Sequence, residues 1–271
     1  MKYDYVTIVS VYGHNDGSTS IPSILKSSES LPGSKALLLS ISCPVSLPEC
    51  IAWKKIPPLN FQQYSIFMMY CLASFIKTDF ALCVQADSWV LNQSAWTDNF
   101  LEYDYIGAPN GVGLNTPKSE GDPGCRVFGM LLRGESEWVN EKNPIGVMNG
   151  GFSLRSKKFL NAPRDIGIPY TFNDHPILQN EDLQLCILMK PQLIDAGIKF
   201  ASLDVAKIFS FETYITALHS SLNLDNVFGI HQGHMRLVGL SQILFEEQFN
   251  PFYLPILLPY FKKLGYEVIY E

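Results

Sequence analysis

Two acidic residues stand side by side in the segment QNEDLQLC, residues 179–186. Glu181 and Asp182 lie where polar sequence changes into an apolar run. A carboxylate in the first turn of a helix bonds free backbone N–H groups, and Asn180 is a good N-cap residue. A carboxylate that reaches an acceptor hydroxyl can instead take its proton as a general base. The segment alone fits both interpretations.

A third carboxylate, Asp87, ends the apolar segment DFALCVQAD, residues 79–87. The apolar run predicts a buried strand that ends at Asp87. In parallel sheets, ligands bind beyond the carboxyl ends of the strands. Asp87 could hold a divalent cation that in turn grips a diphosphate. A strand-ending aspartate that caps the following turn is the plainer alternative.

Two further segments contain residues suited to ligand binding. In NGGFSLRS, residues 149–156, the pair Gly150-Gly151 suits a backbone with positive φ or close approach by a ligand, and Arg155 could face phosphate. An ordinary turn and a solvated basic face are the alternatives. In FGIHQGH, residues 228–234, His231 could bind a metal or phosphate, or be structural. A zinc site is not expected, because no cysteine lies near it in the sequence.

The elements that would position these residues alternate between strands and helices. Buried strands are predicted for YVTIVSVYG (5–13), KALLLSIS (35–42) and DFALCVQAD (79–87), with a short helix before Gly33 and an amphipathic helix over 61–77. This alternation predicts one α/β domain with a mainly parallel sheet. The segment VMNGGFSLRSKKFL is expected to open with a tight turn. Further on we expect a short strand at KFAS (199–202), a short helix at DVAKIFSFE (204–212) and a helix at MRLVGLSQILFEEQ (235–248).

Composition narrows the class of protein. The chain has 271 residues and a net charge of −6, without the basic stripe that nucleic acids require, so no nucleic-acid partner is expected. Its six cysteines form no C-x-x-C pair, and neither a secretory signal nor an apolar run of about 18 residues is evident, which predicts a cytoplasmic protein. The segment FNPFYLPILLPYFKKLGY (249–266) is compatible with peripheral docking at a membrane surface or with core packing.

Five segments together, in this order, resemble a little-characterised family of glycosyltransferase-like proteins of bacteria and large viruses, catalogued as a domain of unknown function. They are QADSWVLNQSAWTDNFLEYDYIGAP, NGGFSLRS, NEDLQLC, FSFE and FGIHQ. The resemblance runs from about Lys35 to Gln232, and that family is similar to nucleotide-sugar transferases of GT-A type. It implies a Rossmann-like, three-layer α/β/α sandwich with a mostly parallel sheet. We expect one domain over 1–271, with a loop insert at 110–146 and a helical extension at 235–271.

The resemblance also implies roles for residues. Asp182 matches the base of an inverting transfer, with Glu181 as the fallback, and Asp87 and His231 match ligands of Mn²⁺ or Mg²⁺. The donor would be a nucleotide-diphosphate sugar, and the acceptor a glycan or lipid-linked glycan in surface polysaccharide biosynthesis at the inner face of the membrane. Donor contacts are expected from Val11, Tyr12, Asp87, Ser88, Asn149, Gly150, Gly151 and Arg155.

The sequence departs from the pattern at two points. QADSW has one acid where many GT-A enzymes have an Asp-x-Asp pair, and Gln232 follows His231 where a basic residue is expected. A nucleotide-sugar or glycan-binding module with weak catalysis on the same fold therefore stays open. A nucleotidyltransferase is a third hypothesis, but the loop YGHNDGSTS after the first strand lacks the glycine- and basic-rich composition it would need.

Overall fold

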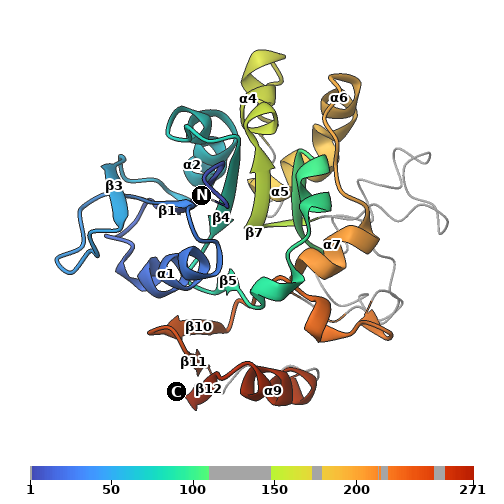
Figure 1. Cartoon of the computed structure of the whole chain (residues 1–271). Coiled ribbons are helices and arrows are strands. Elements are labelled where there is room, and N and C mark those ends of the chain that lie inside the picture. The colour runs from blue at the N-terminus through green and yellow to red at the C-terminus, as the bar shows by residue number, and fades with distance from the viewer. Residues whose placement is uncertain (1, 110–147, 173–178, 213, 215–218, 247–253) are drawn as a thin grey trace.

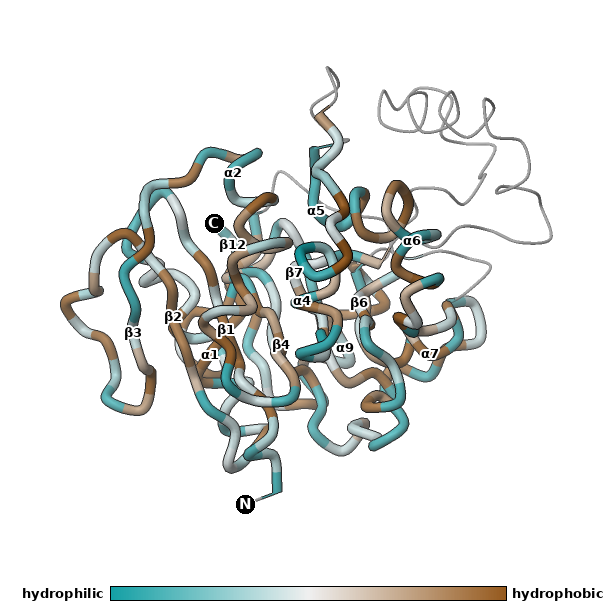
Figure 2. The backbone as a smooth tube through the Cα atoms, turned by 90° about the horizontal axis from the view of Figure 1, so that it is seen from above, coloured by the Kyte–Doolittle hydropathy of each residue, from teal (hydrophilic) through white to brown (hydrophobic). Residues whose placement is uncertain are grey.

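The computed structural model describes residues 2–109, 148–172, 179–212, 214, 219–246 and 254–271. The insert expected at 110–146 lies outside the described residues. Helices flank a central sheet, and the last strands and helix lie together at the bottom of Figure 1. The hydrophobic residues of the central strands run through the interior in the view of Figure 2.

Six strands form the central sheet in the order β3-β2-β1-β4-β7-β6. Neighbours among β3, β2, β1 and β4 are parallel, and only β7 runs antiparallel to both strands beside it. The prediction of a mixed α/β fold with a mostly parallel central sheet is therefore confirmed. The strands are β1 (Val6–Tyr12), β2 (Lys35–Ser40), β3 (Ile51–Lys55), β4 (Phe80–Val84), β6 (Tyr105–Pro109) and β7 (Met148–Ser156).

Alternating residues of the strands face two different helix layers. On β1, Ile8 joins a core cluster that includes Ile24 of α1 (Ile21–Ser30) and Phe209 of α7 (Leu203–Phe209). Its neighbour Val9 joins another cluster with Phe67 and with Leu160 of α4 (Lys157–Asp165). Because side chains alternate across a strand, runs of apolar residues bury both faces of the sheet and produce three layers.

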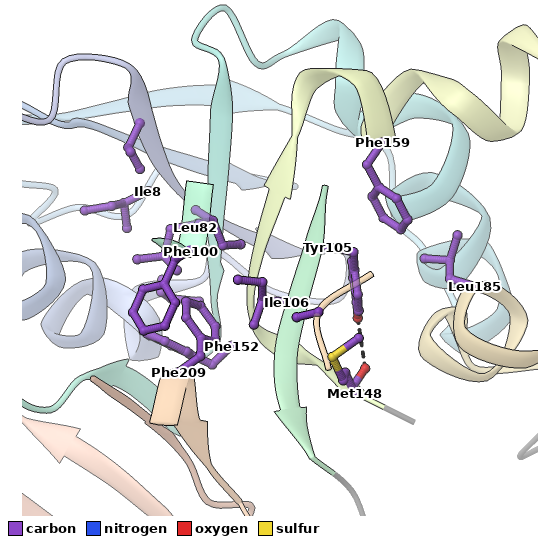
Figure 3. Packing of buried hydrophobic residues seen from close by; sticks show 14 of the residues in the cluster. Ile8, Leu82, Phe100, Tyr105, Ile106, Met148, Phe152, Phe159, Leu185 and Phe209 are labelled. Atoms are coloured by element: carbon purple, nitrogen blue, oxygen red, sulfur yellow. Dashed lines mark hydrogen bonds between the residues drawn. The ribbon is translucent and has the colours of Figure 1, made fainter. Parts of the chain in front are cut away.

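Aromatic side chains fill the layer beside α1 and α7, as Figure 3 shows around Ile8 and Leu82. The ring centroids of Phe100 and Phe209 are 5.2 Å apart in an edge-on arrangement, and those of Phe152 and Phe209 are 5.4 Å apart. Such ring pairs add to the stabilisation from buried apolar area. Since Phe152 lies on β7, this packing fixes the strand directly after Gly150 and Gly151.

The helix predicted from Phe61 is present but changes type along its length. It begins as α2 (Phe61–Ile66), where Asn60 and Gln63 form a capping box. It continues as a π-helical turn over Phe67–Cys71 and ends as a 3₁₀ turn over Leu72–Ser74, short of the predicted Lys77. Its start lies beside the carboxyl end of β1, since Leu59 N donates to the carbonyl of Gly13 at 2.7 Å.

The tight turn predicted at Gly150-Gly151 is wrong, because both glycines lie inside strand β7. Neither has a positive φ. The pairing of β6 with β7 shifts its register between Gly107 and Ala108, so the extra residues of β7 are accommodated as a bulge-like irregularity. Because the two glycines have no side chain, other side chains of the protein can pack directly against the backbone of β7.

The helical extension predicted for 235–271 is also wrong in its first part. Residues 235–245 form an antiparallel pair, β10 (Met235–Val238) and β11 (Gln242–Phe245), joined through Gly239 with φ 79°. Buried and exposed residues alternate along β10, which is the period of a strand. Helix α9 (Leu254–Lys263) follows, and β12 (Glu267–Tyr270) pairs in parallel with β11.

Helix α9 packs against a separate core cluster through its apolar face. Leu254, Leu257, Tyr260 and Phe261 are buried there with residues of β10 and β11. This is the core-packing alternative for the C-terminal segment, while membrane docking stays a prediction. In the described parts of the chain, no helix is both long and apolar enough to cross a bilayer.

The remaining elements complete the surroundings of the site. The short strand expected at KFAS is reduced to a single bridge between Phe200 and Tyr105, whereas the helix expected after it is present as α7. A second small sheet has the order β5-β9-β8. The elements not yet named are β5 (Ser88–Val90), α5 (Glu181–Leu183), α6 (Lys190–Asp195), β8 (Ser210–Phe211) and β9 (Gly229–His231).

Candidate active site

A cleft of about 640 Å³ lies beyond the carboxyl ends of β1 and β4. The last two residues of β1 and the two that follow it (11–14) line the cleft, and residues 85–87 line it directly after β4. The start of α2 and the β10–β11 pair supply the rest of the lining. Val11, Tyr12 and Asp87 therefore lie where ligands are expected in a parallel sheet.

A hydrogen-bonded turn holds Asp87 at the end of β4. The Ser88 hydroxyl accepts from Gln85 N at 2.7 Å and donates to the carbonyl of Gly151 at 2.8 Å. Tyr12 Oη accepts from Ala86 N at 3.2 Å. Ser88 is fully buried, its hydroxyl joins the turn to β7, and it is not among the described residues that line the cleft.

His231 lies between two carboxylates. Its Nε2 is 3.5 Å from Asp87 Oδ2, and its Nδ1 is 3.5 Å from Glu212 Oε1. Burial by itself lowers the pKa of His231, but the charges of Asp87 and Glu212 outweigh it and raise the pKa to about 9. Without a metal, the imidazole therefore carries a positive charge at neutral pH.

These side chains fit a divalent cation in part. A spacing of 3.5 Å between Asp87 Oδ2 and His231 Nε2 is close to that of two ligands each about 2.1 Å from one ion. Among the described residues, neither ring nitrogen of His231 makes a hydrogen bond, although each lies 3.5 Å from a carboxylate oxygen. The same residues include no group of three carboxylate, histidine or cysteine side chains placed to hold a metal. Asp87 and His231 would thus supply two ligands, as suits an ion that also binds diphosphate and water.

The glycines of β7 allow the site's own side chains to come close. A Cβ on Gly151 would lie 2.5 Å from His231 Nε2 and 2.7 Å from Gln85 Oε1. Asn149 Oδ1 accepts from Gly151 N at 2.6 Å, and Asn149 Nδ2 donates to Glu212 Oε1 at 3.1 Å. Gly151 thus makes room for His231, and Asn149 holds the carboxylate on the far side of the imidazole.

Asp182 is a buried acid on the short helix α5. Burial first, and then the charges of Glu181 and Glu212, raise its pKa to about 7 against the opposing effect of the Leu183 N–H. Its Oδ1 accepts from Leu183 N at 2.8 Å. Asn180 occupies the N-cap position but its side chain makes no capping hydrogen bond. A carboxyl whose pKa is near neutral is suited to general-base chemistry.

Glu181 has a different partner from Asp182. Arg155 Nη1 and Nη2 donate to its two carboxylate oxygens at 2.9 and 2.7 Å, and both side chains are buried. Arg155 is 0% exposed, so its position contradicts the expectation that it contacts donor phosphate. The alternative that Glu181 is the base is disfavoured, since both of its carboxylate oxygens accept hydrogen bonds from the guanidinium.

The structure brings part of the expected set together. Asp87, His231, Asn149 and Gly151 form one cluster, and Asp182 acts electrostatically on His231. The described lining of the cleft includes Asp87 but neither His231 nor Asp182. His231 meets the cleft lining at Asp87 through Nε2, and its other ring nitrogen faces Glu212.

Sequence reasoning missed three residues of this region. Glu212 is the last residue of the segment FSFE, which the resemblance contained without a role for it. Gln85 lies in QADSW, and its Nε2 donates to Tyr64 Oη at 3.1 Å. Tyr64 falls within the amphipathic helix predicted over 61–77, and no sequence signal marked it as a cleft residue.

Comparison with known proteins gives one family match. The family described as "Protein of unknown function (DUF5672)" matches residues 56–231. Among curated proteins, none matches the chain significantly.

Three solved structures are similar over different shares of the chain. A crystal structure of an active-site mutant of LgtC has a TM-score of 0.47 and 12% identity, covering 84% of this chain and 87% of that one. The galactosyltransferase LgtC with donor and acceptor sugar analogs has a TM-score of 0.48 and 13% identity over 96% and 95%. The mannosyltransferase PcManGT from Pyrobaculum calidifontis, with GDP-Man and Mn²⁺, has 0.32 and 11% over 59% and 46%.

Proposed function

This chain belongs to the family of proteins of unknown function DUF5672, and we propose that it is a glycosyltransferase. It would move a sugar from a nucleotide-diphosphate donor to a hydroxyl of a glycan acceptor. The observation that carries the proposal is the placement of Asp87. This carboxylate lies in a cleft at the carboxyl ends of β1 and β4, 3.5 Å from the buried imidazole of His231.

We assign separate roles in donor binding, metal binding and proton transfer to these residues. The nucleotide would lie against Val11 and Tyr12 at the end of β1, with its diphosphate near Asp87 and His231. A Mn²⁺ or Mg²⁺ ion bound there would neutralise charge that grows on the leaving diphosphate. Asp182 would take the proton of the acceptor hydroxyl while the hydroxyl oxygen attacks the anomeric carbon of the donor sugar. One base and no covalent sugar intermediate are the requirements of an inverting transfer.

The first experiment tests the donor class without assuming the sugar. Purified protein is heated with UDP, GDP or dTDP, each with and without Mn²⁺, because a ligand that binds the folded state raises the Tm. We expect one nucleotide to raise the Tm, and more so with Mn²⁺. A flat response across the panel would count heavily against the proposal.

Transfer is assayed next with diphosphate sugars of whichever nucleotide raises the Tm. Proton NMR of the anomeric signal in the first product formed distinguishes inversion from retention. We expect inversion, with Asp182 as the base. Retention would leave the transferase proposal standing and reject the role of Asp182 in a single displacement.

A second function has support from one feature of the site. Asp182 does not line the described cleft, so a ligand bound beside Asp87 need not reach it. A nucleotide-sugar or glycan-binding module with weak catalysis fits that separation. Tight nucleotide binding without transfer or slow hydrolysis of any donor sugar would favour this alternative.

The place of the reaction follows from the proposed substrates. We expect the enzyme to act in the cytoplasm on a growing surface glycan, or on a lipid-linked glycan at the inner face of the membrane. Sedimentation with acidic lipid vesicles, with and without α9, tests whether the C-terminal segment contributes to such contact. Failure of the full chain to bind vesicles would remove the membrane part of the proposal.

A further inference from the structure

Arg155 is fully buried, and all three nitrogens of its guanidinium donate hydrogen bonds. Besides its two bonds to Glu181, Nε donates to Ser153 Oγ at 2.9 Å, and Nη2 donates to the carbonyl of Gly150 at 3.2 Å. The guanidinium carbon lies 5.5 Å from the ring centroid of Tyr105. A two-pronged arginine–carboxylate pair restricts orientation as well as distance. Arg155 thus fixes the direction of the Glu181 side chain relative to β7.

The backbone of β7 is shaped to admit this ion pair. A Cβ on Gly150 would lie 2.1 Å from Glu181 Oε1 and 2.8 Å from Arg155 Nη2. Any side chain at this position would therefore collide with the contact between the two charges. The two glycines of NGGFSLRS have separate uses, since Gly151 makes room for His231 and Gly150 makes room for Glu181.

Helix α5 is short and its N-terminus has no side-chain cap. It spans only Glu181–Leu183 before the chain passes into a π-helical turn over Gln184–Leu188. Asn180 provides no side-chain cap, although Gln184 N donates to its carbonyl at 3.0 Å. The ion pair of Glu181 with Arg155 is a strong contact from this first turn to the central sheet, and Asp182 is the next residue.

We propose that Arg155 is a positioning residue for Asp182. Through Glu181 it ties the first turn of α5 to β7, so that the Asp182 carboxylate keeps a fixed place in the site. The role in catalysis rests on the proposed function, whereas the anchoring of α5 does not. Arg155 itself touches no substrate in this scheme, because it is enclosed by protein on all sides.

The test must separate positioning from a general contribution to stability. Removing one partner of a buried ion pair leaves an uncompensated charge, so Arg155→Met alone is prone to fail to fold. The double variant Arg155→Met/Glu181→Leu replaces both charges with apolar groups of similar volume, a change that often preserves stability. Ile24→Val, in the buried face of α1, is the control for a small loss of packing away from α5.

Two measurements are made on the double variant, and one of them needs no activity. Hydrogen exchange at the Leu183 and Gln184 amides is expected to be about tenfold faster than in the wild type, because the first turn opens locally. The kcat for transfer is expected to fall about 100-fold with the donor KM within about twofold, as for a misplaced reacting group. Ile24→Val should change neither quantity.

Arg155→Lys supplies a further distinction. It keeps the charge but not the fork that grips both oxygens of Glu181, so we expect exchange and kcat to resemble those of the double variant. Wild-type exchange at Leu183 and Gln184 in the double variant overturns the inference, whatever the activity. Faster exchange with undiminished kcat also overturns it. Absence of transfer by the wild type with every donor would defeat the proposed function instead, and the exchange result would still decide whether Arg155 anchors α5.

Discussion

The carboxylate of Asp87 lies 3.5 Å from Nε2 of His231, although the two residues are far apart in the sequence. Strand pairing creates this proximity. Ser88 of β5 lies opposite His231 of β9, and Gln232 N donates to the carbonyl of Asp87 at 2.8 Å. The small β5-β9-β8 sheet thus joins the end of β4 to the late histidine.

Asp182→Asn is expected to lower kcat at least about 100-fold, because an amide cannot take the acceptor's proton. The Kd for nucleotide should stay within about twofold of the wild-type value, since Asp182 does not line the described cleft. Calorimetry and a transfer assay measure the two effects separately. Asp204→Asn, at an exposed carboxylate on α7, is the control. Near-normal turnover of Asp182→Asn would reject the base assignment.

The free energy of unfolding should depend on pH through Asp182. Its pKa of about 7 in the folded state lies above the ordinary aspartate value of 3.8, so the folded state binds more protons between these pH values. Stability from this group is therefore complete below about pH 4 and is lost as the pH rises toward 7. We expect Asp182→Asn to be more stable than the wild type by about 1–3 kcal/mol at pH 8 and by clearly less at pH 4.5.

Denaturant unfolding at the two pH values checks this expectation. The comparison uses Asp204→Asn again, because that exposed carboxylate should show no such pH-dependent difference. Equal stabilisation by Asp182→Asn at pH 4.5 and pH 8 would mean that the buried charge is not its source.

Asp87→Asn should remove the effect of the metal on nucleotide binding. With Mn²⁺ present, we expect the Kd of the best nucleotide to rise about tenfold or more, because a carboxylate ligand is lost. Without Mn²⁺ the Kd should change little. Glu246→Gln is the matched control, since Glu246 is another carboxylate of the same cleft. If both variants respond alike to Mn²⁺, the metal does not bind at Asp87.

Gly150→Ala should lower the free energy of unfolding by about 1–3 kcal/mol, because the new methyl group forces the Arg155–Glu181 pair to move. A Cβ there would lie 2.1 Å from Glu181 Oε1. Gly233→Ala is the control, since a Cβ on Gly233 meets no atom within 4 Å, and its effect should be within about 0.5 kcal/mol. Equal stabilities for the two variants in denaturant unfolding would show that Gly150 tolerates a side chain.

Several elements could be predicted from the sequence because local residue patterns suffice for them. The apolar run of β1 is buried on both faces, and the turn residues around it mark its ends. Helix α2 has its capping box in the sequence, at Asn60 and Gln63. The position of Asp87 beyond β4 followed from the same strand pattern.

Other predictions were wrong because the local pattern has more than one solution. MRLVGLSQILFEEQ has apolar residues at spacings that suit a helix, but the chain reverses at Gly239, and Leu237 lies opposite Ile243. Burial of one face against α9 then favours the strand pair. Gly150-Gly151 suggested a turn, whereas both glycines lie inside a strand, where Gly150 leaves room for Glu181 of α5 and Gly151 leaves room for His231 of β9.

The sequence by itself determined the chemical types available to the site and their places at the ends of strands and helices. Only the tertiary structure decided which of the two adjacent acids has no arginine partner and is suited to act as a base. Glu181 and Asp182 are adjacent and both buried, yet Arg155 binds one of them, and burial beside Glu181 and Glu212 raises the pKa of the other to about 7. The physical reason is that ion pairing and desolvation depend on residues brought together from β7, α5 and the β8 region, which no local pattern specifies.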